Sequence, residues 1–379
     1  MAPILPGSTI GIFGGGQLGR MTAMAARTLG YNVHVLDPSA ECAARAVADR
    51  VVAARFDDAD AAAELARHCD VVTLEIEQIG AASLAAAASH APVRPGPRVL
   101  EIVRERAAQK AWLRDSGFPI GPWRDVNSLG DLERAVAELG TPLFVKANHG
   151  GFDGRGQVRL ESAAGAPDAW RELAERPSVA EKGLGLELEL SVMVARSPSG
   201  EVIAYPPAVN HHENQVLAWS VLPGPLEPEI ARAATTIASD IAVSIGLEGI
   251  LGVEMFLTTA GELLVNELAP RPHNSYHTTE VACVTSQFEQ IVRAVCDLPL
   301  GTTEVSRPSA IVNLFGDVWL GASPPRFDRA LAVPHTRVHL YGKPGPRPGR
   351  KMGHIAAVGS TTDEALARAR DAFAALRQP

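Results

Sequence analysis

The sequence predicts an α/β region at the N-terminus that continues into an α+β region of mixed sheets. Residues 8–90 alternate apolar runs with helical patterns, as in "TIGIFGG", "QLGRMTAMAARTLG" and "NVHVLD". Strands that alternate with helices form a parallel sheet with helices on its faces. After residue 119, strand-like runs such as "TPLFVKA" and "LELELSVMVAR" follow one another with Gly-rich turns between them. That pattern favours hairpins and antiparallel pairing.

A proline-rich joint, "APVRPGPRVL", separates the two regions. The segment "RVLEIVRERAAQKAWLRDSG" that begins in it has an amphipathic pattern and predicts one long helix over 98–117, ended by Gly117 and Pro119. Short strands follow residue 310, and "TDEALARARDAFAALR" predicts a last helix.

The composition excludes several classes of protein. The 379 residues are 46% hydrophobic and 21% charged, with a net charge of −8, so no basic footprint for nucleic acid is visible. Four scattered cysteines have neither metal nor disulfide spacing. No apolar run approaches the roughly 18–20 residues of a membrane span, and the N-terminus lacks the basic segment of a signal peptide. We therefore expect a cytoplasmic protein that binds neither nucleic acid nor membrane.

The first strand ends in "GGGQLG", Gly14 to Gly19, which satisfies G-x-G-x-x-G between a strand and a helix. Asp37 ends the second strand, where a dinucleotide-binding unit has its acidic residue. Backbone N–H groups at a helix N-terminus suit an anionic ligand. A nicotinamide-type dinucleotide is one candidate, and in that case the chain is a non-catalytic dinucleotide-binding regulator.

A predicted hairpin over 250–268 carries two carboxylates. With its turn centred between Ala260 and Gly261, Glu254 faces Glu267. Like charges that face each other across a ladder are destabilising, unless a cation lies between them. With Asn266 beside them, they suit Mg²⁺ carrying substrate phosphates. The alternative is a solvated outer face of the hairpin.

Lys146 lies in an apolar strand, where an unpaired ammonium is costly. The Gly-rich loop 150–156 follows it, and its backbone N–H groups could wrap phosphates. The pair therefore predicts a phosphate site, against the alternative of an ordinary hairpin turn.

Three further segments carry polar chemistry. "EKGLGLELE" places Glu181 and Glu189 beside a short linker, either as ligands of a ribose or an adenine or as solvated strand ends. "APRPHNSYH" concentrates polar groups after the predicted metal hairpin and indicates a substrate site. "YGKPGPRPGRKMGH" holds Lys343, Arg350 and Lys351 in a stiff loop, either as a phosphomonoester clamp or as a basic surface loop.

These motifs in this order resemble the ATP-grasp enzymes. More narrowly, "GGGQLGRM", "GGFDGRGQ", "NELAPRPHNS", "SQFEQ" and "GRKMGH" resemble the 5-(carboxyamino)imidazole ribonucleotide synthase family over residues 8 to about 376. The resemblance implies an ATP-grasp fold and a homodimer. It divides the chain into a Rossmann-like pre-ATP-grasp domain (1–105), a lid (106–184) and a C-terminal mixed-sheet domain (185–379) with a small barrel-like unit from about 310.

The resemblance also implies a reaction: ATP, bicarbonate and 5-aminoimidazole ribonucleotide give the N5-carboxylated product, ADP and phosphate through carboxyphosphate. The implied metal is Mg²⁺, with Mn²⁺ as a possible substitute, held by Glu254 and Glu267. The implied catalytic residues are Asp153, Arg155, Arg271 and Lys343. The implied ATP-binding residues are Arg106, Lys146, Gly151, Phe152, Asp153, Gly154, Arg155, Gly156, Gln157, Glu181, Lys182, Gly183, Leu184, Glu189, His212, Asn266 and Glu267. The implied ribonucleotide-binding residues are Gln17, Leu18, Glu75, Asn274, Lys343, Arg350 and Lys351.

The chain departs from the family pattern at Phe152, where tyrosine is frequent, at Tyr276, where glycine is usual, and at Thr278, where an aromatic residue is usual. "TLEIEQI" resembles the formate-dependent phosphoribosylglycinamide formyltransferase family as much as the synthase family. That activity is therefore the alternative within the same fold. A degenerate ATP-grasp module is disfavoured, since Lys146, Glu254 and Glu267 are all present.

Overall fold

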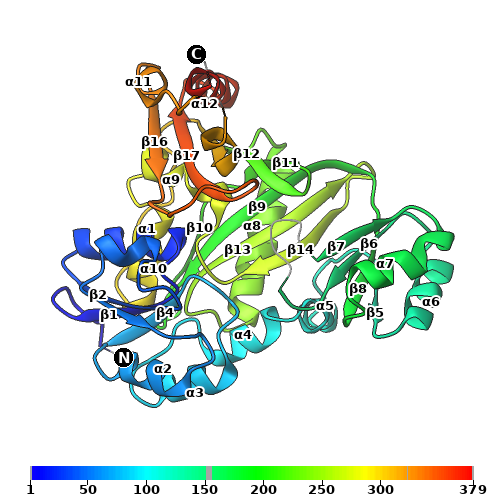
Figure 1. Ribbon diagram of the computed structural model, residues 1–379, viewed down its shortest axis with the longest axis horizontal. Coiled ribbons are helices and arrows are strands. Elements are labelled where there is room, and N and C mark those ends of the chain that lie inside the picture. Colours follow the sequence, from blue (N-terminus) through cyan, green and yellow to red (C-terminus); the bar gives the residue numbers. More distant parts are fainter. Residues whose placement is uncertain (1, 151–155, 322, 378–379) are drawn as a thin grey trace.

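The N-terminal part of the chain forms the predicted parallel sheet, in the order β3–β2–β1–β4 (Figure 1). In this computed structural model, residues 2–150, 156–321 and 323–377 are described. Ile10 and Ile12 pack with Ala23 of helix α1 in one core cluster, and Phe13 and Leu36 pack with α2 and α3 in another, so helices cover both faces. The elements are β1 (Thr9–Phe13), α1 (Gln17–Thr28), β2 (Asn32–Asp37), η1 (Ala43–Ala46), β3 (Arg50–Ala53), α2 (Ala59–Ala66), β4 (Val71–Leu74) and α3 (Ala81–Ala88).

The prediction of one long helix over 98–117 is wrong, because the segment forms α4 (Pro97–Val103) and α5 (Arg106–Asp115). Glu105 has extended backbone between them. The side chain of Gln109 donates to the backbone oxygens of Val103 and Leu268 and accepts from the Leu268 N–H. These tertiary bonds replace the helical ladder at the break and fix the start of α5 against a distant strand.

The antiparallel sheet that follows has the order β5–β8–β6–β7 and lies at one end of the molecule (Figure 1). It has its own core cluster, formed with the two helices of this unit. The elements are β5 (Trp123–Val126), α6 (Leu129–Leu139), β6 (Leu143–Ala147), β7 (Gln157–Leu160), η2 (Ala163–Gly165), α7 (Ala166–Glu172) and β8 (Ser178–Lys182).

A large antiparallel sheet forms the centre of the molecule, in the order β14–β13–β9–β11–β12–β15–β17–β16, with β10 on β9 (Figure 1). Its strands are β9 (Leu186–Arg196), β10 (Val202–Ala204), β11 (Ala208–Glu213), β12 (Val216–Leu222), β13 (Gly249–Thr258), β14 (Leu263–Ala269), β15 (Ser309–Phe315), β16 (Thr336–Leu340) and β17 (Lys351–Val358). Its helices are α8 (Pro228–Ser244), η3 (Asn274–Tyr276), α9 (Thr279–Ala282), α10 (Gln287–Val295), η4 (Gly316–Trp319), α11 (Phe327–Ala330) and α12 (Thr362–Leu376).

The strands after residue 309 do not close into the expected barrel-like unit. β15 pairs with β12, and β17 and β16 continue outward as an open extension of the central sheet. The outer edge of β12 would otherwise leave a row of backbone N–H and C=O groups unpaired. The C-terminal strands satisfy that edge, and α12 packs against them through Ala369 and Leu376.

The parallel sheet and the central sheet share one hydrophobic core. Phe13, Leu74 and Leu100 belong to the same cluster as Val192 of β9 and Val253 of β13. The carboxyl ends of β1 and β4 are therefore held against the hairpin that carries the predicted metal ligands. Among the helices that the structure describes, none combines the length and the apolar character needed to cross a bilayer.

Candidate active site

The predicted pairing of Glu254 with Glu267 is confirmed, although the turn is not where the sequence placed it. Near the turn Leu257 faces Leu263 and Met255 faces Val265, which centres the turn on Ala260. A bulge then inserts Asn266 as an extra residue, so that Glu267 faces Glu254. The bulge re-aims the Asn266 side chain, as bulges beside functional sites commonly do.

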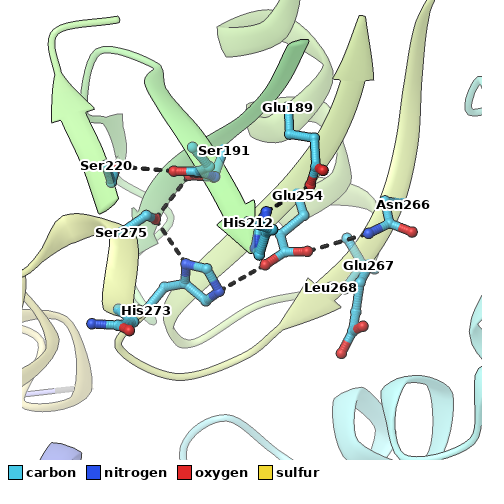
Figure 2. Close-up of polar contacts among 12 residues, drawn as sticks. Glu189, Ser191, His212, Ser220, Glu254, Asn266, Glu267, Leu268, His273 and Ser275 are labelled. Carbon is cyan, nitrogen blue, oxygen red and sulfur yellow. Dashed lines mark hydrogen bonds and ion pairs between the residues drawn. The ribbon is translucent and has the colours of Figure 1, made fainter. Parts of the chain in front are cut away.

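The two carboxylates are held by different partners, and Figure 2 shows those of Glu254. Glu254 Oε1 lies 3.0 Å from His273 Nε2, and its Oε2 accepts from Asn266 Nδ2 at 3.2 Å. Burial alone would raise the pKa of Glu254, but these hydrogen bonds and the nearby imidazoles lower that pKa to about 2. Glu267 Oε2 accepts from the Arg106 guanidinium at 2.8 Å. Both acidic groups are therefore placed to act as carboxylates.

The donor set at this hairpin fits a hard divalent cation. Among the described residues, the Asn266 Oδ1 atom is buried without a hydrogen-bond partner. The Asn266 residue lies between Glu267 in the chain and Glu254 across the hairpin, and carboxylate and amide oxygens are the ligands that Mg²⁺ and Ca²⁺ prefer. Arg106, at the start of α5, would share a phosphate-bearing ligand with such an ion.

Lys146 does not need a phosphate to be buried, contrary to the sequence argument. Its ammonium lies 3.0 Å from Glu181 Oε2, and Lys110 of α5 lies 3.2 Å from Glu181 Oε1. Burial would raise the pKa of Glu181, but the two lysines outweigh it and lower that pKa to about 2. The triad carries a net positive charge, so it still favours an anion nearby. The sequence argument overlooked Lys110, although it follows Arg106 at i+4 on one helix face.

Glu189 and His212 form a second charged pair beside the hairpin of β13 and β14, which carries the predicted metal ligands and is called the metal hairpin below. Glu189 Oε2 of β9 lies 2.8 Å from His212 Nδ1 of β11, next to a bulge at Ala218 of β12. Burial lowers the pKa of His212, but the bond to Glu189 outweighs it and raises that pKa. On β9, Glu189 faces Phe256, two positions from the register of Glu254. The predicted ribose contact and the predicted metal ligand thus lie on one face of one sheet.

The N-terminal glycine loop is already occupied by carboxylates of this chain. Glu75, at the end of β4, accepts from the Gly16 N–H at 2.5 Å and from the Gly19 N–H at 2.7 Å. Asp37 accepts from the Gly15 N–H at 2.8 Å, as expected for a strand-end capping residue. A dinucleotide pyrophosphate uses these same donors. Glu75 and Asp37 therefore occupy the donors that such a ligand would need.

Replacing Glu75 with Gln is expected to destabilise the fold by about 1–3 kcal/mol, because one of its oxygens becomes an NH₂ group that faces a backbone N–H donor. Burial already raises the pKa of Glu75 against the effect of both N–H bonds. Urea unfolding measures the difference. Glu41→Gln, at an exposed loop position, is the control; equal losses in both variants would contradict this reading of the loop.

Two predicted ribonucleotide ligands from opposite ends of the chain meet. Lys343 Nζ contacts Gln17 Oε1, 326 residues away, and donates to the Lys351 oxygen at 3.2 Å. The Arg350 guanidinium donates to the Pro344 and Gly345 oxygens, and burial with the nearby Arg347 lowers its pKa. Lys343 thus brings the C-terminal loop against the N-terminus of α1, and the backbone of Lys351 helps to hold it there.

Two other predicted ribonucleotide ligands are engaged within the protein. Asn274 pairs its amide with that of Asn313, at 3.1 and 2.7 Å. Leu18 packs in a cluster with Tyr341.

Arg271 donates to Glu77 at 2.7 Å. Burial lowers its pKa, but Glu77, Glu267 and Glu75 together raise it. Arg271 therefore lies within the electrostatic reach of both the metal hairpin and the glycine loop.

The remaining predicted residues divide by position. Gly151, Phe152, Asp153, Gly154 and Arg155 lie outside the described residues. Gln157 begins β7 and faces Lys146 of β6, and Gly156 precedes it with its oxygen accepting from the Ala147 N–H at 2.8 Å. Lys182 is exposed, and the Gly183 N–H donates to the Pro142 oxygen at 2.8 Å. Leu184 follows in the half-buried linker to β9.

A histidine cluster behind the ribonucleotide side has no part in the sequence argument. Glu280, His339 and His354 bring possible metal-ligand atoms within 4.8 Å of one another. The His339 and His354 rings stack at 5.1 Å and 13°, and His354 Nδ1 is bonded to the Tyr341 hydroxyl. Because the two rings are parallel, their nitrogen lone pairs do not converge on one point, as the ligands of a metal ion must. The cluster therefore serves to pack the junction between α9, β16 and β17.

Comparisons with known proteins fit this geometry. Three family profiles match in succession: a ribonucleotide synthetase preATP-grasp domain over residues 7–104, an ATP-grasp domain over 111–288, and a phosphoribosylaminoimidazole carboxylase C-terminal domain over 309–368. The N5-carboxyaminoimidazole ribonucleotide synthase of Bacillus subtilis is 41% identical over 362 residues, covering 95% of this chain and 94% of that protein. The chain belongs to the N5-carboxyaminoimidazole ribonucleotide synthase family. It is an ATP-dependent ligase that carboxylates 5-aminoimidazole ribonucleotide in purine biosynthesis.

Other synthases support the same assignment. The Brucella melitensis synthase is 42% identical over 352 residues, covering 92% of this chain and 96% of that protein. A crystal structure of an N5-carboxyaminoimidazole ribonucleotide synthetase with ADP superposes with a TM-score of 0.93, at 39% identity over 100% of both chains. The Aspergillus clavatus synthase with ADP and 5-aminoimidazole ribonucleotide gives 0.90, at 32% identity over 97% and 98% of the chains. The assignment rules out the regulator and formyltransferase alternatives.

Proposed function

We propose that this synthase takes its carbon from bicarbonate through carboxyphosphate, with Glu254 and Glu267 holding Mg²⁺ at the ATP phosphates. The observation that carries the proposal is the paired carboxylate hairpin with the unpartnered Asn266 oxygen beside it. Mn²⁺ has the same preference for carboxylate and carbonyl oxygens and is expected to substitute. The bound ion would neutralise charge on the transferred phosphoryl group, which is the main requirement of this chemistry.

In the first step an oxygen of bicarbonate attacks the γ-phosphorus of ATP, the bond to the β–γ bridging oxygen breaks, and ADP leaves. Arg106 and the Lys110–Glu181–Lys146 triad surround this position with positive charge. Positioned cations stabilise the charge that builds up in the transition state. Asp153 and Arg155 stay assigned to the loop that covers the phosphates, and Glu189 with His212 to the ribose side.

In the second step the exocyclic amine of the aminoimidazole attacks the carboxyl carbon of carboxyphosphate, and inorganic phosphate leaves with the electron pair of the broken C–O bond. The amine loses one proton to solvent or to the departing phosphate. Arg271 is the cation within reach of both halves of the site, so we assign it to the carboxyphosphate. Gln17, Lys343 and Lys351 form the site for the 5′-phosphate.

The test measures ADP release with Mg²⁺, ATP and bicarbonate, with and without 5-aminoimidazole ribonucleotide. A large increase on adding the ribonucleotide supports the proposal. Turnover with formate and glycinamide ribonucleotide instead would overturn the choice of carbon source. Equal turnover after bicarbonate is removed and CO₂ excluded would also contradict it.

Lys343→Ala is expected to raise the KM for 5-aminoimidazole ribonucleotide by about 10- to 100-fold, because a charge-assisted phosphate contact contributes about 1.5–3 kcal/mol. The KM for ATP should stay within twofold, since the ATP side lies on the hairpin and the lid. Steady-state kinetics with each substrate varied checks this. Arg337→Ala, at an exposed position of β16, is the matched control; an equal rise there would indicate a general charge effect.

Three further assignments belong to this proposal. The domain limits at about 105 and 184 divide the chain near the start of α5 and after β8. A homodimer and a cytoplasmic location are expected of a purine-biosynthesis enzyme of this family. Analytical ultracentrifugation tests the homodimer: a single species at the 40.0 kDa chain mass across the working concentration range would overturn it.

A further inference from the structure

A line of buried polar side chains runs across the central sheet to the metal hairpin (Figure 2). Ser220 of β12 donates to Asn210 Oδ1 at 2.9 Å, and Asn210 Nδ2 donates to Ser191 Oγ of β9 at 3.0 Å. Ser191 Oγ lies 2.8 Å from Ser275 Oγ, which lies 2.8 Å from His273 Nδ1. His273 Nε2 then reaches Glu254. We call this line the serine relay.

The members of the serine relay are shielded from water. Ser191, Ser220 and Ser275 are completely buried, and Asn210 is 6% exposed. They come from three strands and from η3, so their contacts depend on the register of the whole sheet. Ser191 faces Glu254 across β9 and β13, and Asn210 faces Ser220 across β11 and β12. A buried hydroxyl or amide is costly without a partner, and each of these groups has one.

The direction of the serine relay is fixed by counting hydrogens. A carboxylate only accepts, so the His273 nitrogen that faces Glu254 carries the proton. When the ring is neutral, its other nitrogen only accepts, and Ser275 then donates to it. Each hydroxyl has one hydrogen. Ser275 must then accept from Ser191.

The same count continues to the far end of the serine relay. Ser191, having spent its hydrogen on Ser275, must accept from an amide nitrogen. Asn210 turns its Nδ2 toward Ser191 and its Oδ1 toward Ser220. This is the orientation that the count requires. If Asn210 instead turned its Oδ1 toward Ser191, the Ser191 hydroxyl would donate to that oxygen and no longer to Ser275. Ser275 would then accept from His273 Nδ1, and that nitrogen would carry a proton.

We propose that Ser275, Ser191 and Asn210 are positioning residues that hold His273 as its Nε2–H tautomer, so that it fixes the Glu254 carboxylate for the divalent cation. The inference rests on the proposed metal role of Glu254. His273 occupies one carboxylate oxygen and Asn266 the other. These two bonds fix the plane of the Glu254 carboxylate, and with it the directions of the lone pairs that each oxygen keeps for a metal ion. Groups that orient metal ligands in this way commonly set metal affinity by 10- to 100-fold.

The first test reads the tautomer directly in metal-free enzyme labelled with ¹⁵N-histidine, by long-range ¹H–¹⁵N NMR. The signal of His273 is assigned by its absence in His273→Asn. We expect a protonated Nε2 and an unprotonated Nδ1 in the parent enzyme. Ser275→Ala should move the signals toward a mixture of tautomers. A protonated Nδ1 in the parent enzyme would overturn the proposal, whatever the metal does.

The second test measures Mn²⁺ binding in the presence of ADP by the EPR signal of the free ion. Ser275→Ala and Asn210→Asp are expected to weaken binding about tenfold, and Ser275→Thr to restore it. The matched control is Ser309→Ala, since Ser309 is a buried serine whose hydroxyl donates to the Leu222 backbone oxygen at 3.2 Å and takes no part in the serine relay. Binding by Ser275→Ala equal to that of the parent enzyme would overturn the positioning role.

Failure of the metal assignment itself gives a different result. If Glu254→Gln binds Mn²⁺ as the parent enzyme does, then Glu254 is not a metal ligand and the proposed function is corrected. The tautomer experiment needs no metal, so its result stands in either case. Urea unfolding of each variant separates a local loss of order from a loss of fold.

Discussion

Glu267→Gln is expected to lower kcat by about 100- to 1,000-fold, the range found when one preorganised charge-stabilising group is lost. The substitution keeps the size of the side chain but removes a charge from the hairpin. In the parent enzyme the Arg106 guanidinium lies 2.8 Å from Glu267 Oε2. The substitution removes the negative charge of that partner. Single-turnover phosphoryl transfer, measured as ADP formed per enzyme, isolates this step from product release.

The control for this prediction lies on the same hairpin. Glu262→Gln changes an exposed carboxylate beside the turn and should keep kcat within twofold. Raising the Mg²⁺ or Mn²⁺ concentration should recover part of the Glu267→Gln activity, since weaker metal binding is offset by mass action. A variant that retains parental turnover at limiting Mg²⁺ would remove Glu267 from the metal site.

Glu181→Gln is expected to destabilise the fold by about 3–5 kcal/mol, the usual result of removing one partner from a buried ion pair. Lys110 and Lys146 are 4% and 9% exposed, and both depend on this one carboxylate. Burial already lowers the pKa of Lys110 against the effect of Glu181. Urea unfolding of the parent enzyme and of Glu181→Gln measures the difference in their free energies of unfolding. Glu187→Gln, at an exposed position of β9, should change it by less than about 0.5 kcal/mol.

The same triad gives a pH dependence of definite sign. The pKa of Glu181 is lowered from 4.5 to about 2 on folding, so the unfolded chain binds its proton more readily. The stabilisation is present above pH 4.5 and is lost as the pH falls from about 4.5 toward 2. The difference in unfolding free energy between parent and Glu181→Gln should therefore shrink below pH 4.5. A difference that grows in this window would contradict the ionised, doubly paired carboxylate.

Local patterns were enough to predict much of the site. The strand–glycine–helix sequence at Gly14 predicted the first βα unit, and two apolar runs on either side of an Ala260–Gly261 turn predicted the hairpin that pairs Glu254 with Glu267. Local patterns were not enough at the break between α4 and α5. The amphipathic period runs through Glu105. Gln109 caps the first helix at the Val103 oxygen, and Gln109 is itself held by Leu268, 159 residues away.

The sequence by itself determined the family, the order of the motifs and the residue types that we propose to hold phosphate and metal, because these are set by short-range spacing. The tertiary structure alone decided the partners of those residues. It placed Glu75 in the glycine loop and paired both Lys146 and Lys110 with Glu181. It also extended the central sheet where a barrel was expected. Burial makes an uncompensated charge or an unpaired strand edge costly, and the group that compensates it can come from any part of the chain.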